Sequence, residues 1–247
     1  MDPPRGGVSS LLGEMDGSMA GARMTGVRAP IMSSPTIATC DTAEGLAAIN
    51  GADTELVIWQ RAQPVALTAW LGQLARSQLP HFRVLAPLAD LPRAVMAQAD
   101  ESGMPNDGAR DLLLADITRL ATAFAAIAEV DLVDVRLERI SHDACWRFHR
   151  DCVDARLLTT YRGPATEWVP PPYAGDALRD QKAYQGPSEH LGIHDVAVFK
   201  GSCAGPGRGI VHRSPPIAGT GQTRLLLVLN KQSAASPKPW TQAAAST

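Results

Sequence analysis

A histidine and an aspartate lie two residues apart in WRFHRD, residues 146–151, a stretch that is typical of a β-strand. Residues i and i+2 of a strand point to the same face, so the side chains of His149 and Asp151 can converge on one ion. His212 lies downstream, at the end of the apolar run GIVH. Two imidazoles and one carboxylate could together bind a metal ion and leave coordination positions open. The alternative is that these are three unrelated polar residues at strand ends.

An arginine begins the stretch TRLLLVLN, residues 223–230, which is otherwise apolar and is predicted to be a buried strand. A guanidinium in such a strand needs an anionic partner, because an unpaired charge is costly to bury. Arg224 therefore either binds an anionic ligand beside the metal or forms an internal ion pair with an acid such as Asp154 or Glu167.

The order of these residues, His-x-Asp, a distal His and then an Arg, resembles that of the iron(II)/2-oxoglutarate-dependent oxygenases. The segment YRGPATEW, residues 161–168, is similar to a Tyr, Gly-rich, Thr-x-aromatic stretch in the prolyl-hydroxylase-like branch of that family. The family's usual second Gly in this loop is replaced here by Pro164 or Ala165, so the loop is expected to differ in shape.

The resemblance implies a function and a role for each candidate residue. His149, Asp151 and His212 would hold Fe(II) and form the catalytic centre. Arg224 would form a bidentate salt bridge with the distal carboxylate of the cosubstrate 2-oxoglutarate, and Tyr161 or Thr159 would add a hydroxyl donor. The expected reaction is hydroxylation or another oxidation of a small molecule or a protein side chain.

Two alternatives stay open. The stretches FHRDCVDARLLTTYRGPATEWVP and TRLLLVLN also resemble an uncharacterised bacterial family often encoded near zinc-homeostasis genes. The same three ligands could then serve a zinc-binding protein of metal homeostasis without oxidation chemistry. A jelly-roll interaction module without catalysis is the other alternative. A separate zinc site of histidine and cysteines is disfavoured, because His142 and Cys145 have no partner pair at finger-like distance.

The elements that must position these residues change character along the chain. Residues 65–79 and 109–128 have apolar residues at helical spacing, and Asn106 or Asp107 is predicted to cap the second helix. Residues 133–140 alternate apolar and charged side chains, which is the pattern of a strand, and further short strands follow as far as residue 230. We therefore predict an α+β fold in which N-terminal helices pack on one face of a double-stranded β-helix (jelly-roll) core.

This reading divides the chain into four parts. We expect a disordered leader over residues 1–36 and a mainly helical part over 37–128. The jelly-roll metal-binding core is expected over 129–232, and a disordered tail over 233–247.

Charge and composition indicate which kinds of partner and which compartment to expect. The chain has 247 residues and a formal net charge of −2, so charge gives no reason to expect nucleic acid or a membrane as a partner. The N-terminus shows no basic start followed by an apolar stretch, and the four cysteines are scattered, so we expect a cytoplasmic protein. The sequence does not indicate the oligomeric state.

Overall fold

The computed structural model describes residues 36–242, which form a mixed α/β fold built on one large and one small sheet. The predicted leader, apart from Thr36, and the last five residues of the predicted tail lie outside these residues. The large sheet has seven strands in the order β1-β2-β8-β5-β10-β4-β3, and the small sheet has three in the order β7-β6-β9. All neighbouring strands are antiparallel except β1 and β2.

The strands of the large sheet are β1 (Ile37–Cys40), β2 (Leu56–Trp59), β3 (Phe82–Pro87), β4 (Leu132–Ile140), β5 (Ala155–Arg162), β8 (Val196–Lys200) and β10 (Arg224–Lys231). Those of the small sheet are β6 (Glu167–Val169), β7 (Glu189–His190) and β9 (Val211–Arg213). The α-helices are α1 (Val65–Gln73), α2 (Leu91–Glu101), α3 (Gly108–Ala128) and α4 (Ala174–Asp180), and short 3-10 helices connect several of the elements.

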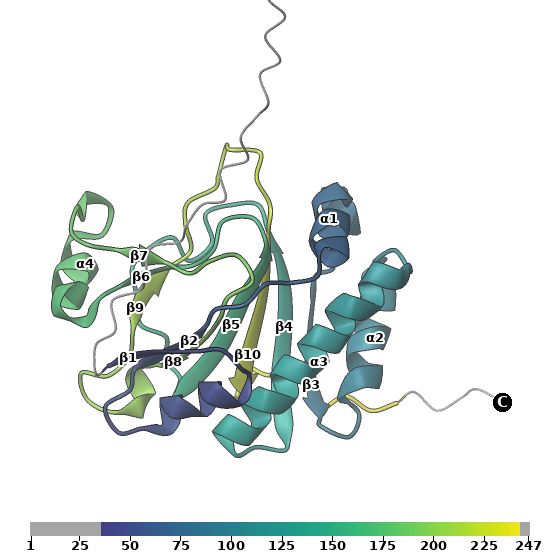
Figure 1. Cartoon of the computed structure of the whole chain (residues 1–247), viewed down its shortest axis with the longest axis horizontal. Helices are drawn as coiled ribbons and strands as arrows, with labels where there is room; N and C mark the ends of the chain where they lie inside the picture. The colour runs from purple at the N-terminus through teal and green to yellow at the C-terminus, as the bar shows by residue number, and fades with distance from the viewer. Residues whose placement is uncertain (1–35, 243–247) are drawn as a thin grey trace, which may run out of the picture. The chain divides into compact units, whose positions relative to one another are not determined.

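The two faces of the large sheet have different coverings. Helices α1, α2 and α3 pack on one face, and the small sheet lies over the other (Figure 1). In β10 the residues Leu225, Leu227 and Leu229 belong to the core beneath the helices. Because side chains alternate along a strand, Arg224 and Leu226 point toward the small sheet. This alternation places the candidate site between the two sheets.

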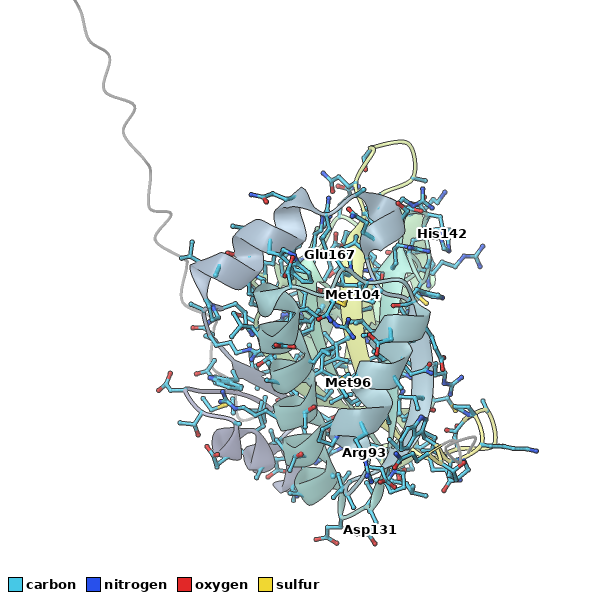
Figure 2. All side chains as sticks on the ribbon, turned by 90° about the vertical axis from the view of Figure 1, so that its right-hand side faces the viewer. Arg93, Met96, Met104, Asp131, His142 and Glu167 are labelled. Carbon is cyan, nitrogen blue, oxygen red and sulfur yellow. The ribbon has the colours of Figure 1, made fainter. Side chains whose placement is uncertain are left out.

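The helical layer explains two elements that the sequence patterns did not predict. Strand β3 buries Phe82, Val84 and Ala86 in the core beneath the helices. Helix α2 buries Leu91 and three small apolar side chains against the same core and turns Arg93 and Met96 outward (Figure 2). The predicted first helix is shorter than expected, since α1 ends at Gln73 and residues 74–79 form a turn with a 3-10 helix.

Helix α3 begins as predicted. The side chain of Asp107 accepts a hydrogen bond of 3.1 Å from the Ala109 amide, which satisfies one of the free donors at the helix start. None of the helices in residues 36–242 is both long enough and apolar enough to span a membrane.

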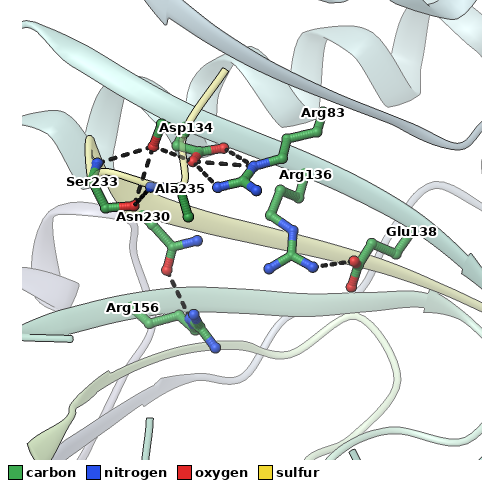
Figure 3. Close-up of polar contacts among 9 residues, drawn as sticks. Arg83, Asp134, Arg136, Glu138, Arg156, Asn230, Ser233 and Ala235 are labelled. Carbon is green, nitrogen blue, oxygen red and sulfur yellow. Dashed lines mark hydrogen bonds and ion pairs between the residues drawn. The ribbon is translucent and has the colours of Figure 1, made fainter. Parts of the chain in front are cut away.

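The first part of the predicted tail is placed against the sheet. Pro239 forms a parallel β-bridge with Leu85, and the Trp240 amide donates a 2.7 Å hydrogen bond to the Leu85 carbonyl. Ser236 Oγ donates to Asp134 Oδ2 at 2.6 Å, within the polar cluster that also holds Arg83 (Figure 3). Residues 233–240 therefore cover one end of β3 and β4.

Candidate metal centre

The three residues predicted to bind a metal come together. One ligand atom from each of His149, Asp151 and His212 lies within 4.8 Å of the others, and this is the one such group found among residues 36–242. His149 and His212 are paired in an antiparallel β-bridge, and each amide donates a 3.0 Å hydrogen bond to the other's carbonyl. The bridge extends the small sheet beyond β9 and sets the two imidazoles side by side, with ring centroids 4.6 Å apart.

Backbone contacts orient both rings. His149 Nδ1 is 2.8 Å from the Arg147 carbonyl, and His212 Nδ1 is 3.1 Å from the Ile210 carbonyl. A carbonyl oxygen can only accept a hydrogen bond, so each Nδ1 carries the proton and donates the bond. Each neutral ring then keeps its lone pair on Nε2. Both Nε2 atoms point toward Asp151, at 3.5 Å from Oδ1 for His149 and 3.4 Å from Oδ2 for His212.

Asp151 is buried, and its surroundings favour the ionised form of its carboxyl group. Burial alone would raise the pKa of its carboxyl, but contacts from both imidazoles and the positive charge of Arg156 outweigh burial and hold the pKa well below its usual value. Arg156 Nη1 lies 2.6 Å from Asp151 Oδ2, yet no donor among the described residues meets this buried oxygen in hydrogen-bonding geometry. An ionised carboxylate that faces two Nε2 lone pairs suits a divalent cation.

Proton and metal compete for one of the rings. The contact with Asp151 raises the pKa of His149 above its usual value, and partial burial opposes this shift only in part. A raised pKa favours the protonated ring, which competes with a metal, since an imidazole binds a metal in its neutral form.

The loop that carries Asp151 is held by an unusually close backbone approach. The Asp151 carbonyl accepts hydrogen bonds from the Ser202 amide at 2.8 Å and the Ser202 hydroxyl at 3.1 Å. A Cβ atom on Gly201 would lie 2.5 Å from that carbonyl oxygen and 2.3 Å from the Val153 carbonyl oxygen. Only glycine at position 201 therefore permits this packing without a shift of the backbone.

Arg224 is fully buried, and no acid among residues 36–242 forms an ion pair with its guanidinium. Its donors reach the Pro164 carbonyl at 2.7 Å, Ser214 Oγ at 2.5 Å and Thr166 Oγ1 at 3.3 Å. All three acceptors are neutral. Burial lowers the pKa of Arg224 to about 10, so the guanidinium remains charged at neutral pH.

The two internal ion pairs considered from the sequence are not formed. Glu167 pairs with Arg213 at 2.5 Å, and Asp154 pairs with Lys231 at 3.5 Å. Within residues 36–242 no carboxylate forms an ion pair with Arg224, which leaves its charge without a counter-ion.

A cavity of about 280 Å³ lies between the two sheets, beside the metal ligands and the hydroxyls that contact Arg224. Both imidazoles line it, together with Arg156 and the two hydroxyl side chains that contact Arg224, Thr166 and Ser214. Leu158, Leu226 and Val228 form an apolar part of its wall. Arg156 is held by a 2.7 Å hydrogen bond from its Nε to Asn230 Oδ1, and Arg136 and Glu138, an ion pair, also line the cavity (Figure 3). The cavity is thus lined by both histidines of the metal group, by the two hydroxyls that contact Arg224 and by an apolar wall.

A family model described as "Protein of unknown function (DUF1826)" matches residues 40–230. The chain belongs to the DUF1826 family. No curated protein matches its sequence.

Several solved structures resemble this DUF1826 chain in fold. The structure of AtDAO1, a dioxygenase for auxin oxidation from Arabidopsis thaliana, in complex with 2-oxoglutarate, is 10% identical. It has a TM-score of 0.44 and covers 82% of this chain and 95% of its own. A Pseudomonas putida prolyl-4-hydroxylase is 15% identical, with a TM-score of 0.31, over 70% of this chain and 97% of its own. AviO1 from Streptomyces viridochromogenes is 14% identical, with a TM-score of 0.32, over 74% of this chain and 92% of its own.

Two residues predicted to bind the cosubstrate lie on the wrong face of β5. Tyr161 belongs to the core beneath the helices, and its hydroxyl donates a 2.6 Å hydrogen bond to Asp116 Oδ2 of α3. Thr159 shares that face, because it lies two residues away along the strand. This corrects the prediction that Tyr161 or Thr159 faces the cosubstrate: the cavity side of β5 is formed by Arg156, Leu158 and, by alternation, Thr160.

The structure also brings in residues that the sequence analysis did not assign to the site. Ser214 lies two residues after His212, so strand periodicity could have placed it on the same face. Thr166 was visible as the threonine of YRGPATEW. Thr160 is buried with no partner for its hydroxyl among the described residues, and nothing in its sequence context separates it from Thr159.

Proposed function

We propose that this DUF1826 chain is an Fe(II)/2-oxoglutarate-dependent oxygenase. One observation carries the proposal: a His-Asp-His group with converging ligand atoms shares a cavity with the hydroxyls that contact Arg224, a buried guanidinium without a counter-ion. The metal group alone would suit zinc as well as iron. The uncompensated cation favours a site that also binds a carboxylate.

We infer further that the two sheets form a double-stranded β-helix. In a jelly roll, successive strands alternate between two facing sheets. Here β4 lies in the large sheet, the segment at His149 pairs with the small one, and β5 returns to the large sheet. Strands β6 and β7 are in the small sheet, β8 in the large, β9 in the small and β10 in the large, which supports this topology.

Each group would have a defined task. His149, Asp151 and His212 would hold the metal through two Nε2 atoms and a carboxylate oxygen. Bound iron(II) with 2-oxoglutarate supplies oxidation of a C–H bond by dioxygen, with release of succinate and carbon dioxide. Arg224 would bind the distal carboxylate of 2-oxoglutarate, because its planar fork matches two oxygens.

The hydroxyls of Ser214 and Thr166 would take the role first predicted for Tyr161 and Thr159. They already contact the guanidinium, so a carboxylate beside it could accept hydrogen bonds from both. The apolar wall of Leu158 and Leu226 would exclude water from the cosubstrate. The substrate would be a small molecule or a protein side chain, and the cytoplasm is the expected compartment.

The test is metal-dependent turnover. The purified chain with Fe(II), ascorbate and 2-oxoglutarate should form succinate in air, even without a substrate, at a slow uncoupled rate. Asp151→Asn and His149→Gln should abolish both succinate formation and Co(II) binding under nitrogen. His190→Gln is a matched control, since His190 is largely exposed and contacts Glu167 rather than the metal group.

Two results would contradict the proposal. If the purified protein holds zinc tightly and does not bind 2-oxoglutarate, a metal-homeostasis role would be favoured. Unchanged Co(II) binding in Asp151→Asn would remove the metal site altogether. The non-catalytic module required an internal acid partner for Arg224, and no such partner is found among residues 36–242.

A further inference from the structure

Two exposed cysteines far apart in the sequence lie close together beside the candidate metal centre. Cys152 Sγ and Cys203 Sγ are 3.6 Å apart, and both are free thiols. Cys152 directly follows Asp151, and Cys203 lies in the 3-10 helix Ser202–Ala204 between β8 and β9. The other two cysteines, Cys40 and Cys145, have no such partner among the described residues.

The backbone holds the two thiols at this spacing. The Cys203 amide donates a 3.2 Å hydrogen bond to the Val153 carbonyl, and the Gly201 amide donates a 3.0 Å bond to the Asp154 carbonyl. The Ser202 amide donates a 2.8 Å bond to the Asp151 carbonyl, so three consecutive amides are bound to the segment 151–154. The proximity of the sulfurs is therefore a property of the packed loops and not of two flexible side chains.

We propose that Cys152 and Cys203 form a reversible disulfide that cross-links the segment carrying Asp151 to the loop between β8 and β9. A disulfide has an S–S length of about 2.05 Å, so the sulfurs need to approach by roughly 1.5 Å. Side-chain rotation at two exposed positions can supply this movement. Both sulfurs are open to solvent, so a small oxidant can reach them.

The oxidant we name is a low-molecular-weight disulfide such as oxidised glutathione. One cysteine sulfur attacks the glutathione disulfide, forms a mixed disulfide and releases one glutathione thiol. The second cysteine sulfur then attacks the protein side of the mixed disulfide and releases the second glutathione thiol. The protein loses two protons and two electrons, and the reagent gains them.

The first experiment maps the linkage in the full chain. Oxidised glutathione should lower the free thiols from four to two per chain, since one disulfide consumes two of the four cysteines. Trypsin should then yield DCVDAR linked to GSCAGPGR, because the two cysteines fall in separate peptides. Reduction with dithiothreitol should restore both peptides.

Matched variants sharpen this test. Cys152→Ser and Cys203→Ser should each abolish the linked peptide, whereas Cys40→Ser and Cys145→Ser should leave it unchanged. Glutathione adducts on Cys152 or Cys203 without an internal bond, or a bond from either to Cys145, would overturn the proposal.

The second experiment tests the effect on Asp151. Release of bound Co(II) to a chelator should be at least roughly threefold slower in the oxidised chain than in the reduced chain, because the bond limits local opening of the ligand segment. In Cys203→Ser the two rates should be equal with and without oxidant. Equal rates of Co(II) release from the oxidised and reduced wild-type chain would show that the disulfide does not restrain the ligand segment. This readout needs metal binding alone and does not depend on oxygenase activity.

Discussion

Replacing Arg224 by methionine separates a ligand-binding cation from a structural one. If Arg224 served the fold through an ion pair, its removal would leave a buried charge and cost about 3–5 kcal/mol of unfolding free energy. Here the hydrogen-bond partners of Arg224 are neutral, so its removal leaves no unpaired charge behind. The fall of the pKa of Arg224 from 12.5 to about 10 corresponds to roughly 3 kcal/mol of unfavourable burial of the charged form.

Methionine removes that penalty and also three hydrogen bonds from the charged guanidinium, to Pro164, Ser214 and Thr166, each of which contributes about 1.5–3 kcal/mol. The removed penalty offsets only part of this loss. The ligand-free Arg224→Met variant should therefore be about 2–6 kcal/mol less stable to urea than the wild type. Binding of 2-oxoglutarate to the Mn(II)-loaded chain without oxygen should weaken by roughly 30- to 1,000-fold, the equivalent of about 2–4 kcal/mol.

Calorimetric titration measures the affinity and urea denaturation measures the stability. Arg83→Met is a matched control, because Arg83 lies on β3 and pairs with the buried Asp134 at 2.6 Å. That variant should lose stability but keep its 2-oxoglutarate affinity. A 2-oxoglutarate affinity within about threefold of wild type in Arg224→Met would refute the reasoning.

Three further predictions follow from individual contacts. Tyr161→Phe removes the hydrogen bond to Asp116 and should lower the free energy of unfolding in urea by about 1–2 kcal/mol, while 2-oxoglutarate affinity stays the same. Weaker 2-oxoglutarate binding in this variant would indicate that Tyr161 contacts the cosubstrate. Gly201→Ala should cost about 1–3 kcal/mol and weaken Co(II) binding, because its Cβ meets two carbonyl oxygens. Gly72→Ala, in open space on α1, should instead gain up to about 1 kcal/mol, and equal behaviour of the two variants would argue against the close approach. Burial, with Arg61 nearby, lowers the pKa of His194, so this residue should make stability fall as the pH drops below about 6.5, by at most about 1.4 kcal/mol per pH unit, while the raised pKa of His149 acts in the opposite direction. His194→Asn, which suits the positive φ at this position, should remove the His194 contribution, so the variant should lose less stability than the wild type between pH 7.5 and 5.5; an unchanged slope would contradict the assignment.

The sequence predicted that His149, Asp151 and His212 come together, and their ligand atoms converge in the structure. The strand predicted over residues 146–151 is reduced to one β-bridge at His149, so Asp151 is placed by a loop and not by strand periodicity. Arg224 stood out as the one charge in an apolar strand. The pairing of His149 with His212 across a β-bridge confirms that distant segments meet, which the order of elements could only suggest.

The face of β5 could not be predicted, because ARLLTTY has apolar residues at both parities. Leu157 points to the helices and Leu158 to the cavity, so hydrophobicity does not distinguish the two sides. The charge of Arg156 is offset by Asp151 on the cavity side, but this pairing of distant residues is not visible in the sequence of the strand. Helix α2 escaped prediction for a related reason, since two of its four buried residues are alanines, which weaken a helical pattern.

The sheet order has a consequence for how the chain can be divided. Strand β2 pairs with β8, and β3 pairs with β4, so strands from the first hundred residues flank the strands of the metal-binding half on both sides. A fragment starting near residue 129 would expose two unpaired strand edges and the apolar surface that α3 covers, and such edges promote aggregation. Expression trials, domain-swap designs and evolutionary fusions should therefore keep residues 36–242 together, because both halves complete a single sheet.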